Sequence, residues 1–180
     1  MTQRLESFPP ILPDHPHTLI LGTMPGKKSL ENQQYYAHPR NQFWRLMGDL
    51  YGAGLLLSYD ERIKILKTKG IAVWDVLRAC TRAGSMDAHI KKEVANNFER
   101  FFAQHPKIAL VVFDSATAEK LYKKHVLKTL TKELIYRLVP SPSPAHARLS
   151  YAEKLALWAK VLKEDGCGGS QRSLFDTMDS

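Results

Sequence analysis

The segment HTLILGTMPGKKS, residues 17–29, begins with an apolar run and ends in a turn that contains Gly22, Pro25 and Gly26. Three more apolar runs follow along the chain: GIAVWDVL (70–77), KIALVVFDS (107–115) and IYRLVPS (135–141). A short apolar run bounded by turn or polar residues is typical of a strand buried on both faces. The sequence therefore predicts four buried strands.

Segments in which apolar residues recur at helical spacing separate or follow these runs. They are NQFWRLMGDLYG (41–52), DERIKILKTK (60–69), DAHIKKEVANNFERFFAQH (87–105), SATAEKLYKKHVL (115–127) and SYAEKLALWAKVLKE (150–164). Parallel strands need long crossover connections, which are usually helical. The alternation predicts a three-layer α/β/α sandwich with a four-stranded, mainly parallel central sheet. Functional groups should gather in the loops at the carboxyl ends of its strands.

The net charge and the cysteine count limit the kinds of molecule and metal site that we expect for this protein. Its 180 residues include 26 Lys and Arg against 18 Asp and Glu, a formal charge of +8. This charge favours a polyanionic partner such as nucleic acid or an anionic membrane surface, although solubility alone also explains it. With only Cys80 and Cys167, the chain has no cysteine-rich zinc ribbon, four-cysteine iron–sulfur site or disulfide framework.

The ends of the chain indicate where the protein works and how it is divided. The N-terminus lacks a secretory pattern, and no apolar run approaches the ~20 residues that span a bilayer, so we expect a cytoplasmic protein without membrane attachment. We expect one domain over residues 1–165. The Gly- and Ser-rich chain after it predicts a flexible tail over residues 166–180.

Three loops together resemble one known family. They are Gly22-x-x-Pro25-Gly26, then Tyr36-Ala37-His38-Pro39-x-Asn41-x-Phe43-Trp44, then Ser141-Pro142-Ser143-Pro144-Ala145-His146-Ala147. In this order they resemble the uracil-DNA glycosylase superfamily, and within it the hypoxanthine-DNA (deoxyinosine) glycosylase family. The resemblance runs from Leu19 to Trp158. It implies a monomeric enzyme of the bacterial cytoplasm or nucleoid that flips a deaminated base out of DNA and hydrolyses its N-glycosidic bond, with no metal or other cofactor.

The resemblance assigns the central roles to Asn41 and Tyr36. Tyr36 matches the aromatic residue that stacks on the extruded base, and otherwise would be a buried core tyrosine. Asn41 would position the attacking water, because a carboxamide can accept from water and donate elsewhere. Asn41 is also suited to cap a helix that begins at Gln42. Met24 stands where many relatives place an Asp or Asn, so Asn41 would have to compensate for it.

The remaining base contacts follow from the same comparison of loops. Gly22, Thr23 and Met24 would approach the base. Asp75 lies where relatives read its Watson–Crick edge, and otherwise caps a helix or forms an ion pair. Because a carboxylate only accepts hydrogen bonds, Asp75 favours the N1–H of hypoxanthine. Asp114-Ser115 stands where the family commonly has Asn-Gly, and this departure leaves the preference between hypoxanthine and uracil open.

His146 has two possible roles in the Pro- and Ser-rich loop. An imidazole there would assist departure of the base, or His146 would probe the gap in the strand, with Arg148 gripping a phosphate. Further phosphate contacts are expected from the first and last loops. The residues proposed for these contacts are Pro25, Gly26, Lys27, Lys28, Ser29, Ser141 and Ser143.

The tail carries a separate motif. Gln171-Arg172-Ser173-Leu174-Phe175 resembles the peptide by which bacterial repair proteins dock on the sliding clamp, with Gln171, Leu174 and Phe175 as anchors. The alternative is a tail that folds back onto the domain. For the whole protein, the alternatives are a catalytically inactive binder of damaged DNA, which Met24 favours, and a hydrolase of free nucleosides.

Overall fold

A computed structural model describes residues 3–165 of the chain. Four strands form one parallel sheet in the order β3-β2-β6-β7. They are β2 (Thr18–Gly22), β3 (Ile71–Asp75), β6 (Leu110–Phe113) and β7 (Ile135–Leu138). Each strand lies within one of the four apolar runs, so the predicted parallel sheet is confirmed.

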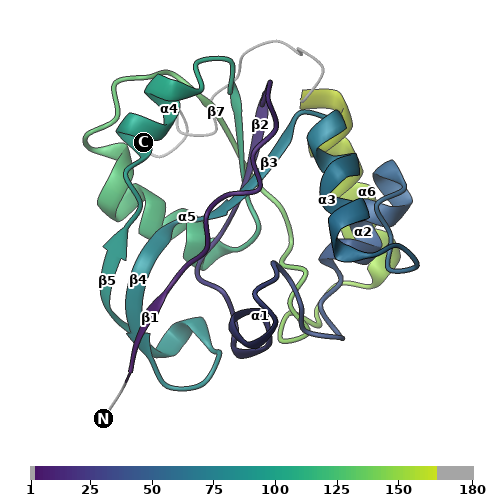
Figure 1. The fold of residues 1–180 in the computed structure, drawn as a ribbon, viewed down its shortest axis with the longest axis horizontal. Coiled ribbons are helices and arrows are strands. Elements are labelled where there is room, and N and C mark those ends of the chain that lie inside the picture. The colour runs from purple at the N-terminus through teal and green to yellow at the C-terminus, as the bar shows by residue number, and fades with distance from the viewer. Residues whose placement is uncertain (1–2, 166–180) are drawn as a thin grey trace, which may run out of the picture.

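Helices cover both faces of this sheet (Figure 1). On one face, α2 (Phe43–Tyr51), α3 (Tyr59–Thr68) and α6 (Tyr151–Ala159) pack around Ile20 and Val112. On the other, α4 (Phe98–Gln104) and α5 (Ala116–Tyr122) pack around Leu19 and Val111. Successive residues of a strand point to opposite faces, so each strand contributes to both cores. The predicted α/β/α sandwich is confirmed.

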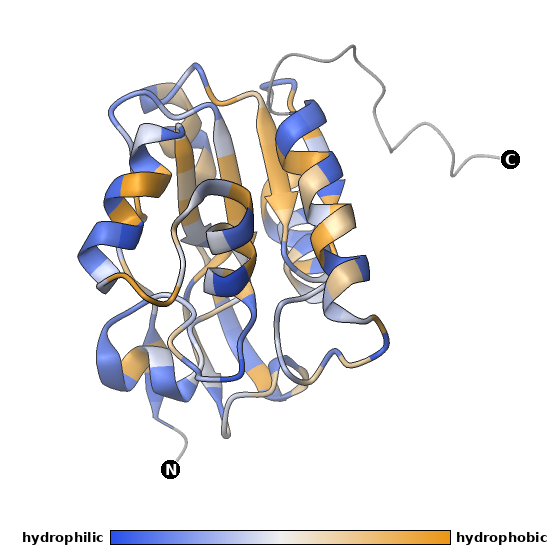
Figure 2. Ribbon diagram, turned by 90° about the vertical axis from the view of Figure 1, so that its right-hand side faces the viewer, coloured by the Kyte–Doolittle hydropathy of each residue, from blue (hydrophilic) through white to orange (hydrophobic). Residues whose placement is uncertain are grey.

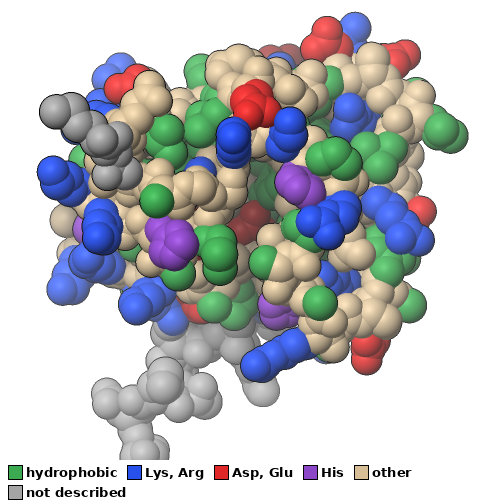
Figure 3. Space-filling model, turned by 90° about the horizontal axis from the view of Figure 1, so that it is seen from below, with side chains coloured by type: hydrophobic (Ala, Val, Ile, Leu, Met, Phe, Trp, Pro, Cys, Tyr) green, Lys and Arg blue, Asp and Glu red, His purple; other side chains and the backbone are tan. Residues whose placement is uncertain are grey.

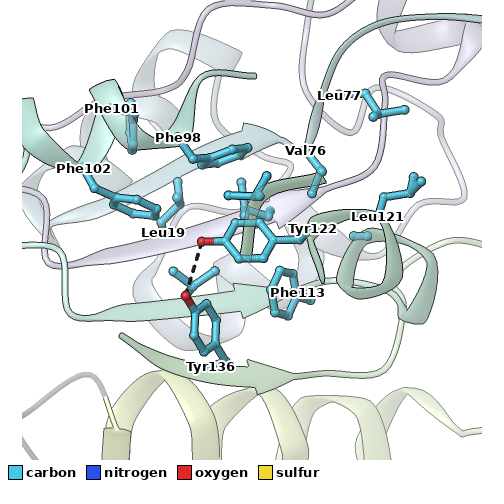
Figure 4. Packing of buried hydrophobic residues seen from close by; sticks show 14 of the residues in the cluster. Leu19, Val76, Leu77, Phe98, Phe101, Phe102, Phe113, Leu121, Tyr122 and Tyr136 are labelled. Carbon is cyan, nitrogen blue, oxygen red and sulfur yellow. Dashed lines mark hydrogen bonds between the residues drawn. The ribbon is translucent and has the colours of Figure 1, made fainter. Parts of the chain in front are cut away.

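Aromatic side chains fill the core beneath α4 and α5 (Figure 4). The rings of Phe98 and Tyr122 meet edge to face with their centroids 5.2 Å apart. The hydroxyl groups of Tyr122 and Tyr136 lie 3.4 Å apart, which gives both buried oxygens a polar partner. Figure 2 shows the resulting pattern, with hydrophobic strands inside and helices that turn hydrophilic residues outward.

Local signals fix where the longer helices begin. Ser58 and Ser150 each accept a hydrogen bond from the backbone of a glutamate three residues later, and that glutamate bonds back to the serine N–H. These capping boxes satisfy amides that the first helical turn leaves unpaired. Two helices continue as π-helical segments, α5 into η2 (Lys123–Leu127) and α6 into η3 (Lys160–Asp165). No helix within residues 3–165 is both long and apolar enough to cross a membrane.

The prediction of one helix over residues 87–105 is wrong. This stretch holds η1 (Asp87–His89), β5 (Ile90–Ala95) and only then α4. β5 pairs with β4 (Leu77–Arg82), which pairs with β1 (Arg4–Glu6) in a second, antiparallel sheet. Pairing with β4 prevails over the helical spacing of the sequence, and the Asn97 side chain caps the helix that starts at Phe98.

Candidate active site

A cavity of about 990 Å³ opens at the carboxyl ends of β2, β6 and β7. A short helix that was not predicted, α1 (Lys27–Asn32), follows β2 on the same side. Figure 3 shows this face of the molecule. Lys, Arg and His side chains lie around a hollow, and an Asp or Glu side chain is visible deep inside it. The segments that line the cavity are 22–29, 35–36, 38, 41, 85–87, 114–117 and 138–146.

Most of the residues singled out from the sequence meet at this cavity. Those on its wall are Gly22, Thr23, Met24, Pro25, Gly26, Lys27, Lys28, Ser29, Tyr36, Asn41, Asp114, Ser141, Ser143 and His146. Asp75 and Arg148 are not on the wall. Gln171, Leu174 and Phe175 lie outside the described residues.

Tyr36 joins two sides of the cavity. Its ring stacks on Phe43 at a centroid distance of 3.9 Å and an interplanar angle of 17°. Its hydroxyl donates a 2.7 Å hydrogen bond to Oδ2 of Asp114. The backbone is left-handed there, with φ of 54°, which is uncommon for an aromatic residue. Tyr36 is thus held by a stack on one face and a hydrogen bond at its tip.

The carboxamide of Asn41 lies where α2 begins. Its Oδ1 accepts a 2.9 Å hydrogen bond from the Phe43 N–H. The backbone N–H of Asn41 donates to the carbonyl of His38. The alternative prediction was that Asn41 caps a helix beginning at Gln42. The helix α2 begins one residue later, at Phe43, and the Asn41 side chain still accepts from an amide of its first turn. Within residues 3–165 its Nδ2 has no hydrogen-bond partner. That amino group and the second lone pair of Oδ1 are available to a ligand.

The loop that carries His146 is tied to the helices behind it. The Nζ of Lys154, a residue of α6 that is 2% exposed, donates to the carbonyl of His146 at 2.7 Å and to Oε1 of Gln42 at 3.1 Å. The backbone N–H of Gln42 donates to the carbonyl of Pro142. These bonds link the His146 loop to the start of α2, where Asn41 lies. Sequence reasoning missed Lys154, although a lysine amid the apolar positions of a helix is unusual.

Two buried carboxyl groups lie close to Gly22. A Cβ placed on Gly22 would come 2.7 Å from Oδ1 of Asp75 and 3.2 Å from Oδ2 of Asp114. Oδ2 of Asp75 accepts a hydrogen bond from the hydroxyl of Ser7 at 2.8 Å. Of these two carboxyl groups, that of Asp114 lies on the cavity wall and that of Asp75 does not.

The protonation of these carboxyl groups is unusual. Burial raises the pKa of Asp75 to about 7, and the charge of Asp114 adds to the rise. Burial likewise raises the pKa of Asp114 to about 7, opposed by the hydrogen bond from Tyr36. Both groups therefore change charge near neutral pH. Within residues 3–165, no three His, Cys, Asp or Glu side chains are arranged to hold a metal ion.

Arg82 connects the first loop to the loop before η1. Its guanidinium, fully buried, donates to the carbonyls of Pro25 and Gly84 and lies 3.8 Å from Oδ1 of Asp87. Burial raises the pKa of Asp87, which accepts a hydrogen bond from Thr23. The helical spacing of residues 87–105 predicts one helix, so this wall is not among the sequence predictions.

Comparison with known proteins agrees with this geometry. Residues 9–164 match the family model described as the uracil DNA glycosylase superfamily. A hypoxanthine DNA glycosylase of Methanosarcina barkeri is 34% identical over 88% of this chain and 98% of its own length, and one of Methanosarcina acetivorans is 36% identical over 79% of this chain and 89% of its own length. A G/U mismatch-specific uracil DNA glycosylase of Schizosaccharomyces pombe is 23% identical over 76% of this chain and 43% of its own length.

A solved structure extends the likeness to the fold. A protein of Methanosarcina acetivorans whose structure was determined by NMR in solution superposes with a TM-score of 0.75 at 34% identity, covering 89% of this chain and 98% of that one. The resemblance that the three loops carry is confirmed over nearly the whole described chain. The protein belongs to the uracil DNA glycosylase superfamily.

Proposed function

We propose that the protein is a monofunctional DNA glycosylase of base excision repair that removes hypoxanthine, and more slowly uracil, from DNA. The observation that carries this proposal is the presence of the Tyr36 ring and the Asn41 carboxamide on one cavity wall. An enzyme that acts on a base must take it out of the stack and replace its lost stacking and edge contacts. The two M. barkeri and M. acetivorans relatives named for hypoxanthine support the choice of base.

The role that we propose for each wall residue is based on its position in the cavity. Phe43 covers one face of the Tyr36 ring, which leaves the other face for the flipped base. Asn41 holds the attacking water with the part of its carboxamide that Phe43 does not use. His146 assists departure of the base by stabilising its developing negative charge. The work of the site is thus mainly positional and electrostatic, and we propose that it needs no cofactor.

DNA binding would rest on the rim of the cavity. Lys27 and the hydroxyls of Ser29, Ser141 and Ser143 are at hand for phosphate contacts, and Arg148 lies exposed near the last loop. We infer a monomer that acts in the cytoplasm, where a net charge of +8 favours binding to the chromosome.

A direct assay tests the proposal. The protein at excess is incubated with duplexes that contain one inosine or one deoxyuridine, and alkali then cleaves any abasic site. Strand cleavage after alkali, strongest for inosine, is the expected result. DNA binding without any abasic product would instead support the second candidate function, a catalytically inactive binder of damaged DNA. The buried Met24, which follows β2, favours this candidate because a thioether cannot hold water firmly.

The tail adds a proposal of its own. We propose that Gln171, Leu174 and Phe175 dock on a bacterial sliding clamp. Deletion of residues 171–180 should abolish binding to the purified clamp and leave cleavage of short oligonucleotides intact. Unchanged clamp binding after the deletion would refute it.

A further inference from the structure

The carboxyl group of Asp114 lies on the cavity wall at the end of β6. It follows β6 directly, is 7% exposed, and lies on the cavity wall beside Gly22 and Thr23. The Tyr36 hydroxyl donates to its Oδ2 at 2.7 Å, and a hydrogen bond with the Ser115 side chain also favours its ionised form. With Oδ2 engaged by Tyr36, the carboxyl plane is fixed and the other oxygen remains to accept from a ligand.

Asp75 does not share this position. It pairs in register with Gly22 across β2 and β3, and its Oδ2 accepts a hydrogen bond from the hydroxyl of Ser7 in the N-terminal segment. Gly22 and Asp114 both line the cavity, and Asp75 does not. The edge-reading role expected for Asp75 therefore fits Asp114 better.

The chemistry of deamination makes an acceptor-only group useful here. Adenine and cytosine carry a lone pair at the ring nitrogen between their pairing groups, N1 and N3 respectively. Deamination to hypoxanthine or uracil places a hydrogen on that nitrogen. At a pH above its raised pKa of about 7, the ionised carboxylate of Asp114 accepts from this N–H and repels the lone pair of the normal base. Guanine carries an N1–H as well, so its exclusion must arise elsewhere in the cavity.

We propose that Asp114, oriented by the Tyr36 hydroxyl, is the specificity-determining residue that recognises the ring N–H created by deamination and rejects adenine and cytosine. This inference rests on the proposed function. It assigns one part of substrate selection to a single pair of side chains that share a hydrogen bond. A site built around a polar partner rejects an analogue with the wrong pattern by large factors, because its buried group is then left unpaired.

Equilibrium binding tests the proposal apart from catalysis. The probes are duplexes that carry 2′-fluoro-2′-deoxyinosine or 2′-fluoro-2′-deoxyadenosine, whose glycosidic bonds resist hydrolysis. The ratio of their Kd values is measured for the wild type and for Asp114→Asn, which keeps the shape but can donate as well as accept. We expect the preference for the inosine probe to fall about tenfold or more. The cost of opening each base pair cancels when the two proteins are compared.

Further variants separate orientation from general damage. Tyr36→Phe keeps the ring but loses the bond to Asp114, so it should reduce the preference in the same direction. Tyr122→Phe, which removes a buried hydroxyl that is not on the cavity wall, is the matched control and should leave the ratio within about twofold. Asp75→Asn tests the neighbouring carboxyl group as the rival reader of the base. Thermal unfolding of each variant identifies any that fails to fold, and Tyr36→Phe then provides the test if Asp114→Asn does not fold.

The outcomes distinguish this inference from the proposed function. If the wild type shows no preference for the inosine probe and excises no inosine, the proposed function fails. If the wild type prefers inosine and folded Asp114→Asn keeps the full preference, the role of Asp114 is refuted. If Asp75→Asn alone loses the preference, the reading of the base belongs to Asp75.

Discussion

The Nζ of Lys154 lies 2.7 Å from the carbonyl oxygen of His146 and so fixes the loop after β7 from behind. The same ammonium group reaches Gln42, the residue between Asn41 and α2. One buried lysine therefore sets the spacing between the two residues proposed for catalysis. Its role is positional, because it acts through these neighbours and is not on the cavity wall.

Replacing Lys154 with Met should slow excision of hypoxanthine about tenfold or more, because small misplacements of catalytic groups are costly. The measurement is single-turnover excision at a temperature well below the unfolding transition. Lys160→Met, at an exposed position of the same helical segment, is the control and should excise at the wild-type rate. A folded Lys154→Met variant with the wild-type rate would show that the loop holds its place without this bond.

The Asn41 side chain has a structural and a proposed catalytic role, which two substitutions separate. Asn41→Ala should lose excision about 100-fold or more and also about 1 kcal/mol of stability, since the Phe43 amide loses its acceptor. Asn41→Ser can still accept from that amide, so it should keep most of the stability while losing excision. Urea unfolding and single-turnover excision measure the two quantities. Excision by Asn41→Ser at the wild-type rate would contradict the water-positioning role.

Gly22 has no room for a side chain. In Gly22→Ala the new methyl group would lie 2.7 Å from Oδ1 of Asp75, so we expect a loss of about 1–3 kcal/mol in the free energy of unfolding. Gly26→Ala is the matched control, because its nearest neighbour would be Ser85 Oγ at 3.8 Å. Urea denaturation compares the two. Equal stability of Gly22→Ala and the wild type would mean that Asp75 moves aside at little cost.

Stability should fall as the pH rises from about 4 to about 7. The pKa of Asp75 is raised from 3.8 to about 7, so in this window the folded protein retains a proton that the unfolded chain has lost. The folded state therefore binds more protons, and its advantage shrinks as pH rises through the folded pKa. Asp114 contributes in the same direction.

The variant Asp75→Asn tests this pH dependence. It should flatten the fall in unfolding free energy between pH 4 and 7, whereas Asp14→Asn, at an exposed site, should leave the slope as it is. Urea unfolding at several pH values gives the slopes. A slope that does not change in Asp75→Asn would assign the proton uptake to Asp114, Asp87 or other groups.

The sequence predicted the central sheet well for a clear physical reason. Strands buried on both faces must be apolar throughout, and four such runs stand out along the chain. The second sheet escaped prediction because β5 exposes Lys91 and Lys92 and owes its form to pairing with β4. Pairing with a neighbouring strand leaves little trace in the local periodicity of a half-exposed segment.

Most wall residues of the candidate site were predicted from the sequence, but the buried residues that hold its loops in place were not. Topology predicts that loops at the carboxyl ends of parallel strands converge, and the resemblance to the uracil-DNA glycosylase superfamily singled out Tyr36, Asn41 and His146 within them. Whether Asp75 or Asp114 faces the cavity depends on their packing around Gly22, which spacing does not reveal. Arg82 and Lys154 act through backbone carbonyls, contacts that no sequence motif records.

The left-handed backbone of Tyr36 sets a limit on how this protein can be improved. Glycine or asparagine would relax the main chain there at little conformational expense, yet neither offers a ring to a nucleobase. The stack on Phe43 and the hydrogen bond to Asp114 outweigh this strain, so a smaller residue would relax the main chain and lose more in packing. Selection for heat tolerance alone should therefore retain the tyrosine.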